Sequence, residues 1–239
     1  MIVSDFAGKN VLVLGGSRGI GAAIVRRFAK GGGRVAFTYA GSKEAAEKLA
    51  GDTGAEAIRT DSADRDALIS TVASRGSLDV IVINAGTLAM GDPLNLAADA
   101  IDRMIDINVR APYHAAVEAA RRMNANGRII VIGSTNADRM PFAGGAGYAL
   151  TKSAIQGMVR GLARDFGDRG ITVNSVQPGP TDSDMNPADG PMADFMHGFM
   201  AIKRHIRADE IAEYAAFLAG PNGAMITGSM QTIDGGFGA

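Results

Sequence analysis

Short apolar runs alternate with longer amphipathic segments along the chain. The runs are rich in Val and Ile and are bounded by Gly, Asn, Asp or Pro, which is typical of buried parallel strands. The segments between them carry apolar residues at helical spacing, as at Ile20, Ile24 and Phe28. This alternation predicts an α/β fold, a Rossmann-type doubly wound parallel sheet with helices on both faces, formed by residues 1–239 as a single domain. We expect strands at residues 11–14, 34–39, 55–61, 79–83, 128–132 and 171–176.

One long helical stretch contains a polar interruption. Residues 98–124 show helical spacing of apolar positions, and Asn108 stands in the middle of them. Asparagine is a poor helix former, because its amide competes for backbone hydrogen bonds. Either the amide repairs a kink at this point, or it presents a polar group to a functional site.

Composition narrows the classes of protein to consider. The length of 239 residues suits one domain, and 24 basic against 25 acidic residues give a net charge of −1. This balance argues against a nucleic-acid partner or a membrane surface. The chain has no cysteine and three scattered histidines, so we expect no disulfide, no thiol nucleophile and no metal site. Without a membrane-length apolar run or a signal-peptide pattern, a cytoplasmic protein is expected.

The turn between the first strand and the first helix is rich in glycine. Glycines let the backbone approach a pyrophosphate closely, and the helix N-terminus offers free N–H groups and a positive dipole end. A tight strand-to-helix turn without a ligand is the alternative. The turn reads Gly15-Gly16-Ser17-Arg18-Gly19-Ile20-Gly21.

The end of the second predicted strand indicates which dinucleotide this turn would bind. Sites for NAD place an acidic residue there, against the 2′-hydroxyl of the adenosine ribose. This chain instead has Tyr39 and Gly41 followed by Ser42 and Lys43. Together with Arg18 in the turn, these groups favour a 2′-phosphate and hence NADP(H). The alternative is that Ser42 caps a helix and Lys43 is simply solvated.

Polar and small residues follow the other predicted strands. The carboxylate of Asp61, next to Ser62, could accept from an adenine amino group or cap the following helix. The sequence Asn84-Ala85-Gly86 would let the chain pass close to the cofactor ribose.

These motifs, in this order, resemble the short-chain dehydrogenase/reductase family over essentially the whole chain. The resemblance also rests on Ser134, the pair Tyr148-x-x-x-Lys152, Asn174 and the turn Pro178-Gly179. It implies seven parallel strands in the order 3-2-1-4-5-6-7 and an NADP(H)-dependent oxidoreductase acting on a small-molecule carbonyl or alcohol. The residues expected to contact the cofactor are Gly15, Ser17, Arg18, Gly19, Ile20, Gly21, Tyr39, Gly41, Ser42, Lys43, Asp61, Ser62, Asn84, Ala85, Gly86, Tyr148, Lys152, Pro178, Gly179 and Thr181.

The expected catalytic residues are Asn108, Ser134, Tyr148 and Lys152. Tyr148 and Lys152 lie four residues apart on one helix face, so the ammonium can lower the pKa of the phenol. Tyr148 would then act as general acid in reduction and general base in oxidation. Ser134 can donate to the carbonyl oxygen as negative charge develops. The resemblance implies that Lys152 also binds the nicotinamide ribose and that Asn108 holds a proton-relaying water.

The same resemblance places a substrate lid at about residues 181–207. Residues 191–200 are rich in Met and Phe, which suits an apolar or aromatic substrate; ordinary buried faces of a short helix are the alternative. Two arginine groupings could contact an acidic nucleotide, but helix-surface ion pairs explain them better. They are Arg160 with Arg164, and Arg103 with Asp106.

Two kinds of partner follow from the resemblance. Within the family the chain is most similar to members that bind cyclic-di-GMP, and more loosely to ketoacyl-carrier-protein reductases, so sequestration of cyclic-di-GMP in biofilm dispersal is the alternative function. A homo-oligomer, dimer or tetramer, is also expected, because the helices at residues 98–124 and 148–167 carry small residues that allow close approach. These are Ala115, Ala116, Ala119, Ala120, Gly157 and Gly161.

Overall fold

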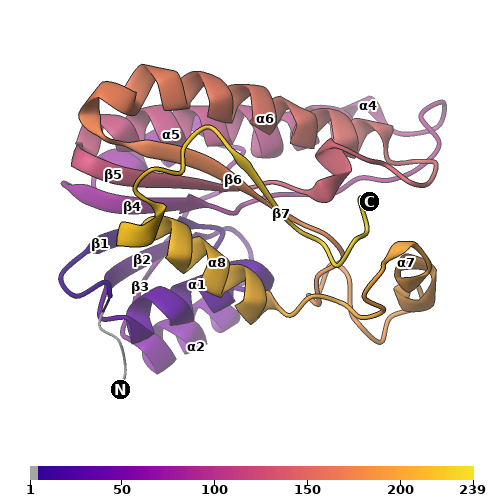
Figure 1. Cartoon of the computed structure of the whole chain (residues 1–239), viewed down its shortest axis with the longest axis horizontal. Coiled ribbons are helices and arrows are strands. Elements are labelled where there is room, and N and C mark those ends of the chain that lie inside the picture. The colour runs from indigo at the N-terminus through magenta and orange to yellow at the C-terminus, as the bar shows by residue number, and fades with distance from the viewer. Residues whose placement is uncertain (1–4) are drawn as a thin grey trace.

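A seven-stranded parallel sheet forms the centre of the computed structural model, which describes residues 5–239 (Figure 1). The strand order is β3-β2-β1-β4-β5-β6-β7, as the family resemblance implies. The strands are β1 (Asn10–Leu14), β2 (Arg34–Tyr39), β3 (Glu56–Arg59), β4 (Leu78–Ile83), β5 (Met123–Ile132), β6 (Thr172–Pro178) and β7 (Met230–Ile233).

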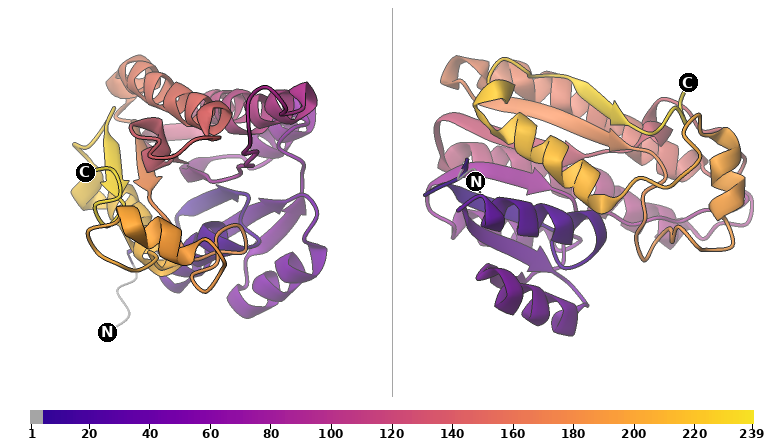
Figure 2. Two further views of the ribbon diagram at one scale, coloured as in Figure 1. Left: turned by 90° about the vertical axis from the view of Figure 1, so that its right-hand side faces the viewer. Right: turned by 60° about the horizontal axis from the view of Figure 1, so that its bottom comes forward.

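Helices cover both faces of the sheet (Figures 1 and 2). One face carries α1 (Gly19–Lys30), α2 (Lys43–Thr53) and α8 (Ala208–Ala219), and the other carries α3 (Arg65–Ala73), α5 (Ala111–Arg122) and α6 (Ala146–Phe166). The remaining helices are α4 (Ala98–Ile105) and α7 (Ala193–Phe199). Among the described residues, no helix combines the length and apolarity needed to cross a bilayer.

The strands have apolar residues on both faces because each face packs against helices. In β1, Val11 and Val13 pack in the core beneath α1 and α8, whereas Leu12 and Leu14 pack in the core beneath α3, α5 and α6. Alternate side chains of a strand point to opposite faces, so burial on both faces requires a continuous apolar run. That is the pattern from which the sheet was predicted.

The interruption at Asn108 is real and takes the form of a single π-helical turn. This turn, Asp106–Arg110, joins α4 to α5, so the predicted stretch at residues 98–124 is two helices in line and ends at Arg122. Such π-turns insert one extra residue into a helix and are frequent at functional sites.

The observed strand boundaries lie within two residues of the expected ones except at the start of β5. Strand β5 begins at Met123, not at 128, because Met123 pairs with Leu78 before a register shift brings Arg128 opposite Val80. Within this irregular start Asn126 has a positive φ of 67°, a conformation that hydrophobic periodicity does not reveal. Strand β3 is shorter than expected, Glu56–Arg59, and lies at the sheet edge, where only β2 pairs with it.

Candidate active site

A cavity of about 760 Å³ opens at the carboxyl ends of the strands. In a doubly wound sheet this is the edge where ligands bind, because the loops after the strands diverge there. Most of the residues singled out from the sequence line it, and Gly21, Lys43 and Asn108 do not. The lining residues that were expected are Gly15, Ser17, Arg18, Gly19, Ile20, Tyr39, Gly41, Ser42, Asp61, Ser62, Asn84, Ala85, Gly86, Ser134, Tyr148, Lys152, Pro178, Gly179 and Thr181.

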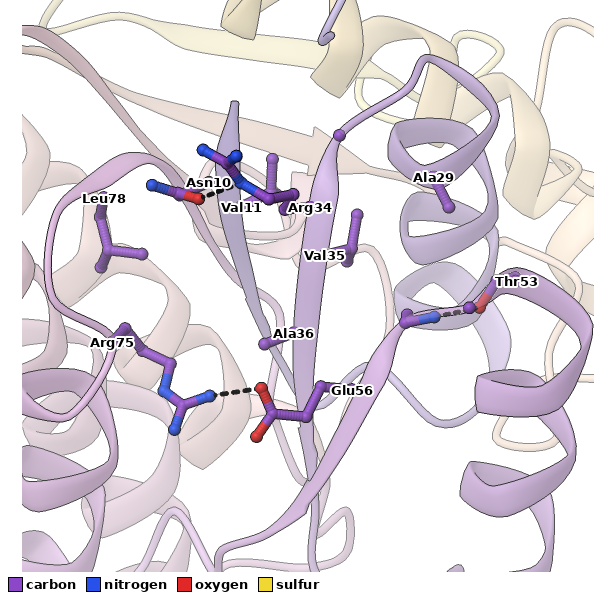
Figure 3. Close-up of a pocket in the computed structure, with 13 residues that line it drawn as sticks. Asn10, Val11, Ala29, Arg34, Val35, Ala36, Thr53, Glu56, Arg75 and Leu78 are labelled. Atoms are coloured by element: carbon purple, nitrogen blue, oxygen red, sulfur yellow. Dashed lines mark hydrogen bonds and ion pairs between the residues drawn. The ribbon is translucent and has the colours of Figure 1, made fainter. Parts of the chain in front are cut away.

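The opposite edge of the sheet holds a second cavity, of about 410 Å³ (Figure 3). Its two arginines already have partners within the protein: Arg75 donates to Glu56 at 2.7 Å, and Arg34 donates to Asn10 at 2.8 Å. None of the residues predicted to be functional lines it. The carboxyl-end cavity is therefore the candidate active site.

The glycine turn is shaped by close packing. Gly15 has a φ of +74°, and a Cβ there would lie 2.7 Å from the Cα of Ala85. A Cβ on Gly21 would lie only 2.1 Å from the carbonyl oxygen of Gly15. Asn84 fixes the turn from the neighbouring strand, because its side-chain N–H donates to that same oxygen at 2.7 Å. Gly21 thus allows the first turn of α1 to pack closely against the glycine turn, which explains why it does not line the cavity.

The cations expected at a 2′-phosphate lie in different surroundings. Arg18 lines the cavity and forms an exposed ion pair with Asp184 of the lid, at 3.0 Å. Ser42 also lines the cavity and precedes α2 at the N-cap position, but its side chain makes no capping hydrogen bond. Lys43 lies outside the cavity wall and pairs with Glu47 at 3.6 Å. The structure therefore brings Arg18 and Ser42 together in the site but not Lys43.

Asp61, which was expected to contact the adenine, faces an arginine from α4. Its carboxylate accepts from the backbone of Ala63 at 2.9 Å and lies 3.5 Å from Arg103, which also lines the cavity. The capping alternative for Asp61 is wrong, because Asp64 caps α3 by accepting from Ala67 at 3.0 Å.

The expected helix-surface ion pairs are also not formed as predicted. Arg103 reaches Asp61 across the cavity, while Asp106 pairs with Arg110 one helical turn further on. Arg160 donates to a neutral partner, Gln156, at 3.5 Å. Spacing along one helix did not reveal these partners, because Asp61 lies far away in the sequence.

Helix α6 brings Tyr148 and Lys152 beside Ser134, which follows β5. The Ser134 hydroxyl lies close enough to the Tyr148 phenol to favour its ionised form. The ammonium of Lys152 lies 5.6 Å from the centroid of the Tyr148 ring and donates to the carbonyl oxygen of Ile132 at 3.1 Å. A hydroxyl, a phenol and an ammonium thus converge at one wall of the cavity.

Burial shifts both of the titratable groups in this cluster. It lowers the pKa of Lys152 to about 8, because no carboxylate compensates for the lost hydration of the ammonium. It also raises the pKa of Tyr148, an effect that the Ser134 hydroxyl partly opposes. The expectation that the Lys152 ammonium lowers the pKa of the phenol is therefore wrong for the protein without cofactor, because desolvation of the phenol is the larger effect. At neutral pH the phenol therefore keeps its proton and the lysine is mostly charged, which suits donation of a proton to a nascent alkoxide.

Asn108 lies behind this cluster rather than in the cavity wall. Its amide accepts from the backbone N–H of Thr87 at 2.9 Å, and it donates to the Thr87 carbonyl at 2.9 Å and to the Thr151 hydroxyl at 3.1 Å. These partners belong to the loop after β4 and to α6, so the amide does not repair the helix in which it stands. A Cβ on Gly86 would lie 3.5 Å from the Asn108 oxygen and 3.7 Å from the Lys152 nitrogen, so that glycine leaves room between the two groups.

The segment expected to form a lid carries α7, and Met192 at the start of this helix and Met196 within it line the cavity. Phe195 is 44 % exposed and packs edge-on against Phe142 with ring centroids 5.5 Å apart. The alternative, that these residues are buried faces of a short helix, does not hold, because Ala193 is the only buried residue of α7.

Several residues of the cavity wall were missed from the sequence. They include Leu88, Met90, Phe142, Asp184 and Phe237, which come from the loops after β4 and β5, from the lid and from the segment after β7. That these segments contribute to the cavity could have been predicted, because each follows the carboxyl end of a strand, and ligands bind at that edge of a doubly wound sheet. Which residues of these loops face the cavity could not be predicted, because loops have no periodic pattern of apolar and polar positions.

Comparison with known proteins agrees with this geometry. Residues 15–238 match the family model described as enoyl-(acyl carrier protein) reductase. The chain is 63% identical over 234 residues to the cyclic-di-GMP-binding biofilm dispersal mediator protein of Escherichia coli K12, covering 98% of this chain and 99% of that one. It is 35% identical over 237 residues to the 3-oxoacyl-[acyl-carrier-protein] reductase MabA of Mycobacterium tuberculosis H37Rv, covering 98% and 94% of the two chains.

A solved structure shows the same fold with a cofactor. The crystal structure of BdcA in complex with NADPH superimposes with a TM-score of 0.97 at 63% identity, covering 98% of this chain and 96% of that chain. The predicted resemblances, to cyclic-di-GMP-binding members and more loosely to ketoacyl-carrier-protein reductases, are confirmed. With the strand order, the glycine turn and the Ser134, Tyr148 and Lys152 cluster in place, the chain belongs to the short-chain dehydrogenase/reductase family.

Proposed function

We propose that the protein is an NADP(H)-dependent carbonyl reductase or alcohol dehydrogenase that works in the cytoplasm. The observation that carries the proposal is the convergence of Ser134, Tyr148 and Lys152 on one wall of the cavity whose other end is the glycine turn. A binding protein needs the turn, but it has no need of a proton donor beside a buried cation.

The residues present fit this cofactor. A Cβ on Gly15 would collide with Ala85, so glycine allows the turn to pack closely there, and Gly15, Ser17 and Gly19 line the cavity in which a pyrophosphate would lie. The N-terminus of α1 begins at Gly19 with no acidic residue in its first turn and no side-chain cap. Arg18 lines the cavity, and the segment after β2 carries no acid to repel a 2′-phosphate. When bound, NADPH supplies the hydride.

The protein's own residues would manage the charge and the proton. Ser134 donates a hydrogen bond to the substrate oxygen and holds it toward Tyr148. Tyr148 gives its proton to that oxygen as negative charge develops, and takes it back in the reverse direction. Lys152 stabilises the resulting phenolate and binds the ribose hydroxyls of the cofactor. Asn108, bound to Thr87 and Thr151, would position the water that returns a proton toward Lys152.

Replacement of the phenol tests this assignment. Tyr148→Phe removes only the hydroxyl, so NADPH affinity should stay within about twofold while turnover of any reducible carbonyl falls by a factor on the order of 10²–10⁴. Tyr113→Phe is the matched control, because Tyr113 is exposed on α5 and lies outside the cavity. NADPH oxidation measured across a panel of ketones and aldehydes provides the readout. Equal turnover by wild type and Tyr148→Phe would remove the basis for the proposal.

A second function is suggested by the relative that is 63% identical and named for binding cyclic-di-GMP. The cavity wall holds three cations, and Lys152 among them is buried behind Tyr148. Arg18 and Arg103, which could meet phosphodiester groups, both lie at the adenosine end. We therefore propose that cyclic-di-GMP, if sequestered, binds at this end and competes with NADPH.

Calorimetry with cyclic-di-GMP, alone and with saturating NADPH, tests this second function. Competition predicts binding that NADPH abolishes and that Arg103→Ala weakens about tenfold, the loss of one charge-assisted contact. Arg160→Ala, on the outer face of α6 and outside the cavity, is the control. Binding of cyclic-di-GMP that NADPH does not affect would place the cyclic-di-GMP site outside the cofactor site. If no binding is detected, the second function is excluded and only the reductase function is retained.

A further inference from the structure

The part of the cavity next to the catalytic cluster has an apolar wall from four separate segments. Leu88 and Met90 come from the loop after β4, Phe142 from the loop before α6, Met192 and Met196 from the lid, and Phe237 from the segment after β7. We call these six residues the apolar wall.

Contacts between these segments place the apolar wall beside Ser134 and Tyr148. The backbone N–H of Gly91 donates to the carbonyl of Gly144 at 3.0 Å, which ties the loop of Leu88 and Met90 to the start of α6. The segment of Phe237 runs past the residue after Ser134, because a Cβ on Gly238 would lie 2.8 Å from the Thr135 methyl group. Whatever carbonyl substituent points away from the cofactor must meet these side chains.

Charged residues are absent from this part of the described cavity. The charged residues that line the cavity are Arg18, Asp61, Arg103, Lys152 and Asp184. Arg18 pairs with Asp184 and Arg103 with Asp61, so these four lie at the cofactor's phosphate and adenine ends, while Lys152 is buried behind Tyr148. An anionic substituent beside the apolar wall would lose hydration without gaining a partner, which opposes its binding.

The apolar wall leaves large hydrophobic side chains exposed. Leu88 is 39 %, Met90 37 % and Met192 48 % exposed, and all three face the same cavity. Apolar surface gathered around one concave site indicates a ligand that covers it. Methionine contributes a flexible, polarisable thioether that packs well against aromatic rings of different shapes.

The lid that carries part of this wall is held in place by its own contacts. At the end of α7 the His197 ring bonds to His205 at 2.8 Å, and the Lys203 ammonium donates to the His197 carbonyl at 2.9 Å. Phe199 packs against Phe142 and Phe237, with ring centroids 6.1 and 5.9 Å apart. These contacts hold the apolar wall in shape, so we expect its selectivity to depend on the side chains that line it.

We infer that the substrate is an uncharged ketone or aldehyde whose substituent is a bulky apolar ring system. This inference rests on the reductase function proposed above and adds the class of substrate. An aromatic substituent would cover the exposed side chains of Leu88, Met90 and Met192, while the carbonyl oxygen meets Ser134 and Tyr148.

Four carbonyl compounds separate size, charge and shape. They are 2-acetylnaphthalene, its carboxylate analogue 6-acetyl-2-naphthoate, butanone, and the uncharged acetoacetyl thioester of N-acetylcysteamine. For wild type with NADPH, we expect kcat/KM for 2-acetylnaphthalene to exceed that for butanone by about 100-fold or more and that for the carboxylate by at least tenfold. A preference for the thioester, for the carboxylate or for butanone would overturn the inference.

A charge placed in the apolar wall provides the matched variant. Met192→Lys should raise the carboxylate-to-naphthalene ratio of kcat/KM about tenfold, because the ammonium supplies the missing partner. Met192 is half exposed, so the lysine side chain fits without disturbing the core. Met225→Lys is the control, since Met225 is 95 % exposed and outside the cavity, and it should leave the ratio unchanged. The same change in both variants would refute a role for the wall.

A binding measurement distinguishes failure of the inference from failure of the proposed function. If none of the four compounds is reduced, the proposed reductase function is not supported. Equilibrium dialysis of 2-acetylnaphthalene and of its carboxylate against the NADPH-loaded protein then measures binding to the apolar wall without turnover. Tighter binding of 2-acetylnaphthalene than of its carboxylate, reversed by Met192→Lys, would still support the ligand class. Equal binding of the two compounds would overturn it.

Discussion

Arg18 is the charged residue on which the preference for NADPH over NADH is chiefly expected to depend, since Lys43 lies outside the cavity wall. Arg18 is exposed at the edge of the cavity and is paired only with the equally exposed Asp184, an interaction worth roughly 0–1 kcal/mol. A 2′-phosphate offers it a stronger, charge-assisted contact of roughly 1.5–3 kcal/mol. Arg18→Ala should therefore weaken NADPH binding about tenfold or more and leave NADH binding nearly unchanged.

Fluorescence titration of both cofactors measures this effect. Arg26→Ala is a suitable control, because Arg26 is an exposed arginine of the same helix α1 that lies outside the cavity. Equal losses for NADPH and NADH in Arg18→Ala would exclude the 2′-phosphate as its partner.

Lys152 gives the reaction its expected pH dependence. Burial lowers the pKa of this group to about 8, so the ammonium is present below pH 8 and is lost as the pH rises through that value. Because the charged lysine stabilises the phenolate left when Tyr148 donates its proton, kcat/KM for reduction should decline above about pH 8. Pre-steady-state rates from pH 6 to 10 measure the profile. A rate that rises through pH 8 would contradict it.

At the scale of residues, local spacing in the sequence predicted which motif side chains lie together in the cavity. Tyr148 and Lys152 could be placed together from their separation on one helix, and both line the cavity. Asp184 and Phe237 could not, because they reach the site through the lid and the segment after β7, whose paths depend on tertiary packing. Lys43 shows the converse error, since proximity in sequence to Ser42 did not bring its side chain into the cavity.

At the scale of elements, the first turn of α8 holds the end of the expected lid segment through the side chain of Glu210. The Glu210 carboxylate accepts from the backbone N–H of Arg207 at 2.8 Å and binds Arg204 through two N–H groups at 2.7 and 2.8 Å. These bonds, chiefly the one from Arg204, lower the pKa of Glu210 to about 2. The carboxylate thus fastens the end of the lid to the first turn of α8.

We expect Glu210→Gln to cost about 1 kcal/mol of folding free energy at neutral pH, a lowering of Tm by about 2–4 °C. The pKa of Glu210 is depressed in the folded state, so its contribution is present above the unfolded value of 4.5 and is lost as the pH falls toward 2. The Tm difference between variant and wild type should therefore shrink over this range in calorimetric scans. Glu47→Gln is the control. It breaks the exposed ion pair with Lys43 and should change Tm by less than about 1 °C.

The elements themselves were predictable wherever a strand or helix is buried by one regular pattern. The apolar run at Val11–Leu14 is one such case, because both faces of this strand pack in the core. The helical spacing of α1 is another, because one stripe of this helix packs in the core. The start of β5 was not predictable, since Met123 joins the sheet through a register shift and not through alternation. The break at Asn108 was recognised from its poor helix propensity, but the π-turn and its bonds to Thr87 and Thr151 emerge only from packing.

For the molecule as a whole, parallel topology determines where the site lies. All strand pairs are parallel, so every strand's carboxyl end faces the same edge and the motifs after β1, β4, β5 and β6 must meet there. The motifs after these strands therefore line one cavity, at the edge of the sheet that their positions in the sequence indicate. The sequence did not indicate how the lid lies over that edge, because no pattern in residues 181–207 encodes its contacts.

Of the small residues on which the expected homo-oligomer was based, those of α5 are buried and those of α6 are open. Ala115 and Ala119 are fully buried in the core of their own subunit and are not available to a second copy. On α6, by contrast, a Cβ at Gly157 or Gly161 would meet no atom within 4 Å, and Leu150 on the same helix is 59 % exposed. This open, partly apolar face of α6 allows two helices to approach closely.

We therefore expect a dimer or tetramer in which α6 packs against its symmetry mate. Light scattering at micromolar concentration should report a mass at least twice that of one chain, and Gly157→Glu should shift it to the monomer by placing like charges across the contact. Gly51→Glu is the control, because Gly51 is an exposed glycine of α2 with equal space around it, and it should leave the mass unchanged. A wild-type monomer, or the same mass for Gly157→Glu as for wild type, would exclude α6 as the interface.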